Sequence, residues 1–149
     1  MNHSNHILND LVSVARDGQD FYQHAADKVV DPDLKSLFTR IAGIKADIVA
    51  TLSSEIKAAG GDKPTQSGTI VGELNKLYGD LRALAGGKDY AYVAQLEHSE
   101  DRLVKAFEDA RNDNDIAPSA LAVLNRLEPE VRQCHELMRT RKLALKKAA

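Results

Sequence analysis

Two charged residues fall at positions where the sequence otherwise places apolar side chains. Lys45 lies seven residues from both Phe38 and Leu52, on a stripe of apolar residues with helical spacing. Glu100 lies four residues after Leu96 on a second stripe of this kind. A buried charge without a partner is costly. Each of these positions therefore requires either a balancing charge or a route by which the charged group reaches water.

Helices must position these residues, because apolar side chains recur at spacings of three and four while strand-like alternation is absent. Glycine and proline gather at a few breaks between the periodic segments. The helices expected from this pattern cover residues 4–29, 32–59, 88–111 and 118–145, and a connection over residues 61–87 carries an additional short helix. The sequence thus predicts an all-α protein, with residues 1–149 forming a single helical domain.

The ends of several helices are marked by residues with well-understood local preferences. Asp31 followed by Pro32 is a favourable start for the second helix, and Gly60-Gly61 is a favourable stop. Pro129 falls inside the last helix and is expected to kink or divide it.

The long connection decides between two bundle topologies. A helix of 25 residues is ~38 Å long, and a connection over 61–87 can run back along that length. The second and third long helices would then be parallel, as in four-helix bundles with one crossover. A simple up-and-down bundle with an extra helix is the alternative.

Composition excludes several functional classes. The net charge of −2 gives no global field for nucleic acid, and apolar runs are far shorter than the ~20 residues of a membrane span. We expect neither a nucleic-acid nor a membrane partner. The N-terminal residues lack the pattern of a signal peptide, and the one cysteine permits no internal disulfide, so a cytoplasmic protein is expected.

Phosphate-binding loops, nucleophile elbows and dinucleotide fingerprints are absent from the sequence, which favours a non-enzymatic protein without catalytic residues.

Several segments resemble known helical bundles. The stretch DFYQHAADKVVDPDLKSLFTRIAG is similar to the first hairpin of rubrerythrin and other ferritin-like proteins. Over most of its length the chain resembles a bacterial ferritin-like family, domain of unknown function 2383. The matching features are NDL and DG in the first helix, DPDLKSLF in the second, GG before the crossover, EHSED in the third and HELMRTR in the last. The resemblance implies a ferritin-like four-helix bundle.

The ferritin-like resemblance also implies where a di-iron or di-manganese site would lie. Such sites take one glutamate from each of two helices and a Glu-x-x-His pair from each of the other two. Aligning on the aromatic residues places these positions at Ala15, Glu100, Lys45, Ile48, Arg132 and His135. Only Glu100 and His135 retain the chemistry of a ligand, and two cations would repel bound metal. The standard site is therefore expected to be degenerate, with no metal cofactor.

On this alignment we hypothesise that Lys45, Glu100, Arg132 and His135 form a polar core cluster in place of the metals, with Glu100 as the counter-ion of Lys45 and Arg132. Each cation also has an alternative interpretation. In that of Lys45, the ammonium reaches water from the edge of the apolar stripe. In those of the other two, Arg132 pairs with Glu128 one helical turn earlier, and His135 forms a hydrogen bond with a backbone carbonyl. If metal is bound, the candidate ligands are Glu100, His135, Glu97 and Asp17.

Three functions follow from these interpretations. The first is a non-enzymatic role in stress protection or protein association, with a homodimer possible. The second is an iron- or manganese-dependent protein or oxidase with a remodelled site. The third is a carrier of a small ligand inside the bundle, for which a cavity beside Ala15 and Gly18 would be the sign.

Overall fold

The computed structural model describes residues 3–60, 69–83 and 89–148 and contains five helices within them. They are α1 (His3–Lys28), α2 (Pro32–Ala58), α3 (Thr69–Arg82), α4 (Asp89–Arg111) and α5 (Pro118–Ala148). No strand occurs in these ranges, which confirms the all-α bundle. The predicted bounds of the four long helices agree with these within three residues. The rest of the predicted crossover, at residues 61–68 and 84–87, lies outside the described residues, as does residue 88, the predicted first residue of the third long helix.

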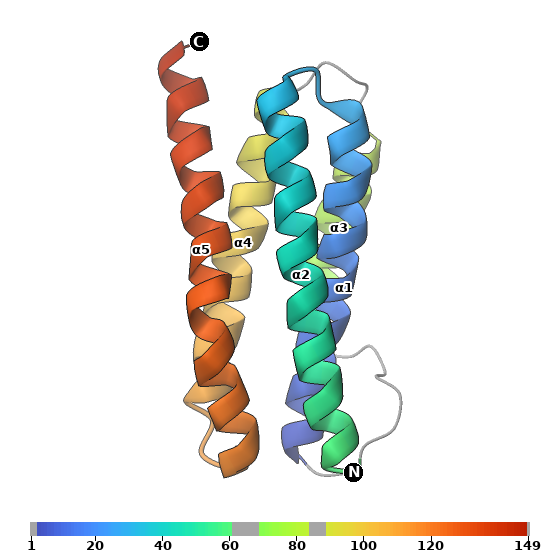
Figure 1. The fold of residues 1–149 in the computed structure, drawn as a ribbon, viewed down its shortest axis with the longest axis vertical. Coiled ribbons are helices and arrows are strands. Elements are labelled where there is room, and N and C mark those ends of the chain that lie inside the picture. The colour runs from blue at the N-terminus through green and yellow to red at the C-terminus, as the bar shows by residue number, and fades with distance from the viewer. Residues whose placement is uncertain (1–2, 61–68, 84–88, 149) are drawn as a thin grey trace.

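The four long helices form two antiparallel hairpins, α1–α2 and α4–α5, that lie side by side (Figure 1). Contacts of α1 with α4 and of α2 with α5 join the hairpins. Helices α2 and α4 run in the same direction, as the long connection between them predicts (Figure 1). Helix α3 lies against α1 and α4 and runs antiparallel to α4.

Local sequence signals explain the sharp turn between α1 and α2. The Asp31 side chain accepts a hydrogen bond from the Asp33 N–H at 2.8 Å, and Pro32 occupies the first turn, where its missing N–H costs nothing. After α2, Gly60 has a φ of 79°, a left-handed conformation that favours glycine.

Helix α5 runs through Pro129 from Pro118 to Ala148, so of the two expected effects of this proline, a kink or a division of the helix, the division does not occur. A proline removes one hydrogen bond from the helix ladder. Pro129 is exposed, so water can reach the carbonyl that loses its partner. On either side of it, Leu127 and Val131 are buried in the same core. Their packing holds the helix against the core on both sides of the proline.

The core is built from apolar side chains of all five helices, including Phe21 and Tyr22 of α1, Phe38 of α2, Phe107 of α4 and Met138 of α5. Ring contacts reinforce it: Phe21 stacks on Tyr78 of α3 at 5.3 Å between ring centroids, and Tyr22 meets Phe38 edge-on at 5.6 Å.

Polar contacts tie the hairpins together at both ends of the bundle. At one end the His3 imidazole lies 2.9 Å from the Asp113 carboxylate, and the Ala117 N–H donates to the Ser4 hydroxyl at 2.7 Å. At the other end the backbone N–H groups of the α1–α2 turn donate to the Asp89 carboxylate. These contacts fix how far the hairpins are displaced along each other.

Candidate functional site

An ion pair lies at the centre of the bundle. The Lys45 ammonium on α2 is 2.6 Å from a carboxylate oxygen, Oε1, of Glu100 on α4, and each side chain is only 1% exposed. The structure thus brings together the two charges that the apolar stripes placed in the core. Lys45 does not reach water, so the interpretation that put it at the edge of its stripe is wrong.

Tyrosine hydroxyls surround this pair. The Tyr22 hydroxyl on α1 donates to Oε2, the second oxygen of Glu100, at 2.6 Å. Burial and the adjacent Glu100 carboxylate raise the pKa of Tyr22 well above its ordinary value, so the phenol stays protonated and remains a donor. Burial and the same carboxylate also raise the pKa of Tyr78, which approaches from α3.

Gly18 allows these groups to approach one another. A Cβ at this position of α1 would lie 3.1 Å from the Tyr78 hydroxyl and 3.8 Å from Cε of Lys45. A cavity beside Ala15 and Gly18 would have been the sign of a small-ligand carrier, and next to Gly18 this space holds side chains of α2 and α3.

The opposite charges of Lys45 and Glu100 neutralise each other. Burial works to lower the pKa of Lys45, but the Glu100 carboxylate outweighs it and leaves that pKa above its ordinary value. The ammonium is therefore the stable form. From α5, the thiol of Cys134 is influenced by both charges; burial is the larger effect and raises its pKa to about 12. A thiol held neutral in this way is a poor nucleophile.

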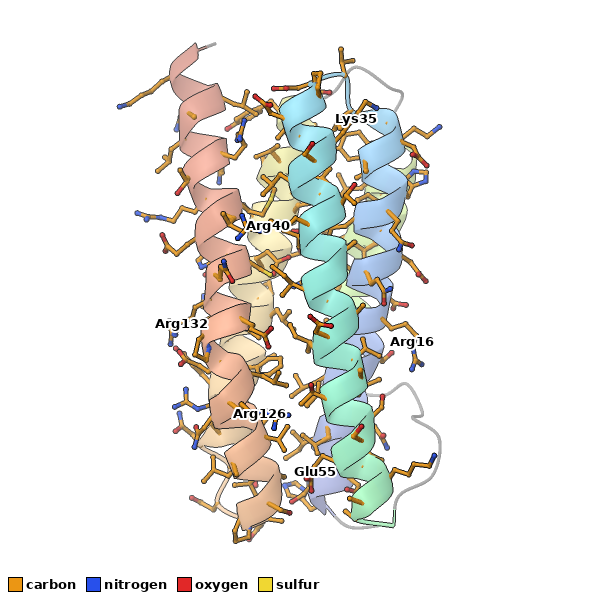
Figure 2. The ribbon with its side chains drawn as sticks, in the orientation of Figure 1. Arg16, Lys35, Arg40, Glu55, Arg126 and Arg132 are labelled. Atoms are coloured by element: carbon orange, nitrogen blue, oxygen red, sulfur yellow. The ribbon has the colours of Figure 1, made fainter. Side chains whose placement is uncertain are left out.

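Arg132 lies outside this centre, contrary to the cluster hypothesis. Its side chain is 49% exposed and pairs with Glu128 on its own helix and with Glu108 of α4. Figure 2 shows it at the outer edge of α5. These carboxylates raise the pKa of the guanidinium. The pairing with Glu128 is the alternative that the spacing of one helical turn had suggested.

His135 is also placed elsewhere, at a half-buried site between α4 and α5. Its Nε2 lies 2.9 Å from the Glu97 carboxylate and 3.9 Å from that of Asp101. The other oxygen of Glu97 accepts from the Lys142 ammonium at 3.0 Å. Burial tends to raise the pKa of Glu97, but the hydrogen bonds from Lys142 and His135 prevail and lower it.

The cluster hypothesis misplaced Arg132 and His135 because it put them on the core face of α5. Adjacent residues on a helix point about 100° apart, and each of the two directly follows a residue that faces the core. The residues of α5 that face the core are Val131 and Cys134, and both are buried. Their apolar spacing with Leu127 and Met138 is the signal that identifies them.

A family comparison is informative at this point. Residues 4–113 match the family described as Domain of unknown function (DUF2383). The chain belongs to this family. No curated protein and no solved structure matches it. The DUF2383 match includes Tyr22, Lys45 and Glu100 and ends before α5. None of the described helices is both long and apolar enough to cross a membrane.

The centre of this DUF2383 protein does not fit a di-metal site. Both oxygens of Glu100 are engaged, one by the Lys45 ammonium and one by the Tyr22 hydroxyl. The adjoining positions on α1 and α5 are Gly18 and Cys134, and neither supplies the carboxylate that bridged iron or manganese requires. A protonated lysine at this place would also repel divalent cations.

Of the remaining metal-ligand candidates, Glu97 and His135 lie together between α4 and α5, whereas Asp17 lies on α1. The charge of Asp17 is one of the causes that raise the pKa of Tyr78. Among the described residues, His3, Asp113 and Asp115 place ligand atoms within 4.8 Å of one another at the end of the bundle, where His3 and Asp115 are exposed. His3 and Asp113 already form an ion pair, which raises the pKa of His3 and lowers that of Asp113.

Proposed function

We propose that this protein is a ferritin-like bundle that works without a di-metal centre, in a non-enzymatic role in protein association or stress protection. The topology supports the first part: two antiparallel hairpins are joined by one long crossover, and α2 and α4 are parallel. Ferritin-like bundles use this connectivity and place their metals between the four helices, where this chain has a lysine.

The observation that carries the proposal is the contact between the Lys45 ammonium and Glu100 at 2.6 Å, fully inside the bundle. In a di-metal protein the carboxylates of the core are neutralised by cations from solution. Here the cation is part of the chain. The centre therefore needs no metal for charge balance, and its groups hold the helices together rather than activate a substrate.

Metal content tests this proposal. The protein is expressed in medium supplemented with iron, manganese and zinc, purified by gel filtration and analysed by elemental mass spectrometry. We expect less than about a tenth of an equivalent of metal per chain at the bundle centre. Glu100→Gln is the matched variant, because it removes the carboxylate charge with little change of shape. About one or two equivalents in the wild type, lost in Glu100→Gln, would contradict the proposal.

The contact between His135 and Glu97 favours a second candidate, a divalent cation site on the α4–α5 surface. An imidazole and a carboxylate 2.9 Å apart, with Asp101 at 3.9 Å from the same nitrogen, are ligands that zinc accepts. Lys142 competes for Glu97 at this place. Zinc binding that is lost in His135→Ala, retained in Glu100→Gln and strengthened in Lys142→Ala would support this candidate. Binding unaffected by His135→Ala would exclude it.

A further inference from the structure

An imidazole from the start of the chain lies against two carboxylates at one end of the bundle. His3 begins α1, whereas Asp113 and Asp115 belong to the turn between α4 and α5. The start of α1 and this turn lie at the same end of the bundle (Figure 1). One ligand atom from each of these three side chains lies within 4.8 Å of the other two. The first hairpin and the second thus bring groups that bind metals to one place.

The spacing of these groups suits a single small cation. His3 Nε2 lies 3.0 Å from Oδ1 and 2.9 Å from Oδ2 of Asp113. Two atoms that bind the same zinc ion at about 2.0–2.2 Å each stand roughly 3–4 Å apart. The side chain of Asp115 is exposed, so its rotation can shorten the remaining distances. Small movements of side chains are therefore sufficient to place all three ligands on one ion.

Hydrogen bonds hold the backbone on both sides of this group. The Asp115 N–H donates to Oδ1 of Asp113 at 2.8 Å, which fixes the two carboxylates relative to each other. Next to His3, the hydroxyl of the buried Ser4 accepts a hydrogen bond from the Ala117 N–H at 2.7 Å. The start of α1 is thus fixed on the turn, while the exposed His3 and Asp115 side chains remain open to ions from solution.

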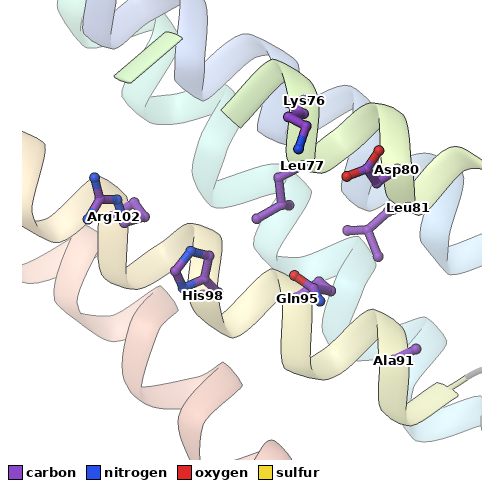
Figure 3. A pocket seen from close by; sticks show the side chains of 8 residues that line it. All are labelled: Lys76, Leu77, Asp80, Leu81, Ala91, Gln95, His98 and Arg102. Carbon is purple, nitrogen blue, oxygen red and sulfur yellow. The ribbon is translucent and has the colours of Figure 1, made fainter. Parts of the chain in front are cut away.

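Another exposed histidine provides a contrast. His98 of α4 lines a cleft between α3 and α4, together with the cationic side chains of Lys76 and Arg102 (Figure 3). Among the described residues, the set of His3, Asp113 and Asp115 is the one group of three that meets the spacing of metal ligands, and His98 belongs to no such group. An exposed imidazole alone does not make a metal site, so His98 serves below as the control.

We propose that His3, Asp113 and Asp115 bind a divalent transition-metal cation such as zinc. Zinc accepts imidazole nitrogen and carboxylate oxygen together, and three protein ligands with water in the remaining position form a known kind of zinc site. On binding, the cation replaces the proton of the hydrogen bond between His3 and Asp113, and that proton passes to solvent. The cation then balances the charges of the two carboxylates. Magnesium and calcium prefer oxygen ligands, so they should bind here more weakly.

A cation at this place would join the two hairpins directly. His3 and Asp113 lie 110 residues apart in sequence, and each would be bound to the same ion. A ligand that binds only the folded chain stabilises it, so zinc should raise the melting temperature. This site goes beyond the proposed function and does not depend on it, because no residue of the Lys45–Glu100 centre takes part in it.

Zinc titration of the full chain without an affinity tag tests the proposal. Calorimetry should show that the wild type binds about one equivalent more than His3→Ala does. Nitrogen-15 spectra of the histidine side chains should show that the imidazole signals of His3 shift with zinc, whereas those of His98 do not. Zinc should also raise the melting temperature of the wild type more than that of His3→Ala.

Further variants separate this site from other places that could hold metal. Asp113→Asn keeps an oxygen that accepts the hydrogen bond from Asp115 but removes a charge, and it should weaken zinc binding by about tenfold or more. Asp115→Asn should act in the same direction. The matched control, His98→Ala, should bind zinc as the wild type does. Glu100→Gln and His135→Ala should also retain this ion, which distinguishes it from metal at the bundle centre or on the α4–α5 surface.

Several results would overturn the proposal. Equal zinc stoichiometry in the wild type and His3→Ala would show that His3 is not a ligand, and so would imidazole signals of His3 that do not shift at saturating zinc. An equal loss of affinity in His98→Ala would reduce the binding to any exposed imidazole. Circular dichroism shows whether each variant has folded, and His3→Gln, a change at a side chain that is 53% exposed, repeats the test if Asp113→Asn has not.

Discussion

Two ion pairs of this molecule have nearly the same geometry and very different surroundings. Lys45 and Glu100 lie 2.6 Å apart with 1% of each side chain exposed, whereas Arg132 and Glu108 lie 3.0 Å apart with nearly half of each exposed. In the first pair neither charge can be rehydrated if its partner is removed. In the second, water and salt replace the partner at little cost. The comparison teaches that burial, rather than the distance between the charged atoms, decides how much each ion pair affects the free energy of unfolding.

The largest effect is expected from removing one charge of the buried pair. Glu100→Leu leaves the Lys45 ammonium stranded in the core, and the free energy of unfolding should fall by about 3–5 kcal/mol. Guanidinium denaturation measures the change. The double variant Lys45→Met/Glu100→Leu replaces both charges by apolar groups and should recover most of the loss. If Glu100→Leu is as stable as the wild type, the ammonium is not confined to the core.

A smaller loss is expected when the carboxylate keeps its cation but loses a hydrogen bond. Tyr22→Phe removes the hydroxyl that donates to Glu100 at 2.6 Å, and a hydrogen bond to a charged group contributes about 1.5–3 kcal/mol. Tyr90→Phe is the control, because Tyr90 is 42% exposed. Equal denaturation midpoints for the two variants would show that the Tyr22 hydroxyl is unimportant to stability.

The half-buried contact of Glu97 with His135 and Lys142 should fall between the extremes and depend on pH. The pKa of Glu97 is lowered from 4.5 in the folded protein, so its contribution is present above that value and is lost as the pH falls through the folded pKa. Glu97→Gln should therefore cost about 1 kcal/mol near neutral pH and progressively less in acid. Denaturation at a series of pH values checks this, and a difference that grows in acid would give the wrong sign.

The smallest effect is expected at the exposed pair. Arg132→Ala should leave the denaturation midpoint close to that of the wild type, because exposed ion pairs contribute little. The remaining effect should fade in high salt. A destabilisation as large as that of Glu100→Leu would mean that Arg132 supports more of the α4–α5 contact than its exposure indicates.

The sequence predicted the helices well because their signals are local. Capping by Asp31, the glycines after α2 and the three-and-four spacing of apolar residues act within a few positions of one another. The pairing of Lys45 with Glu100 was also predictable, since each charge stands on an apolar stripe and only an opposite charge makes its burial affordable.

The positions of Arg132 and His135 depended on how α5 is rotated about its own axis. A resemblance to distant proteins does not determine that rotation. The stripe that contains Val131 and Cys134 places Arg132 and His135 off the core face, and this internal signal was more informative than the alignment. Tyr22 was not among the residues expected at the site. Its hydroxyl was the missed signal, because a tyrosine on a buried stripe needs a hydrogen-bond partner that phenylalanine does not.

The contacts of Asp89 have a consequence for the order in which the protein folds. Its carboxylate accepts hydrogen bonds from the N–H groups of Val30 and Asp31, which lie 59 and 58 residues away in sequence, respectively. A hairpin such as α1–α2 can form from local contacts, but these two amides gain their partner only when the second hairpin has docked. Slow hydrogen exchange at Val30 and Asp31 would thus follow the meeting of the two hairpins rather than the formation of either one.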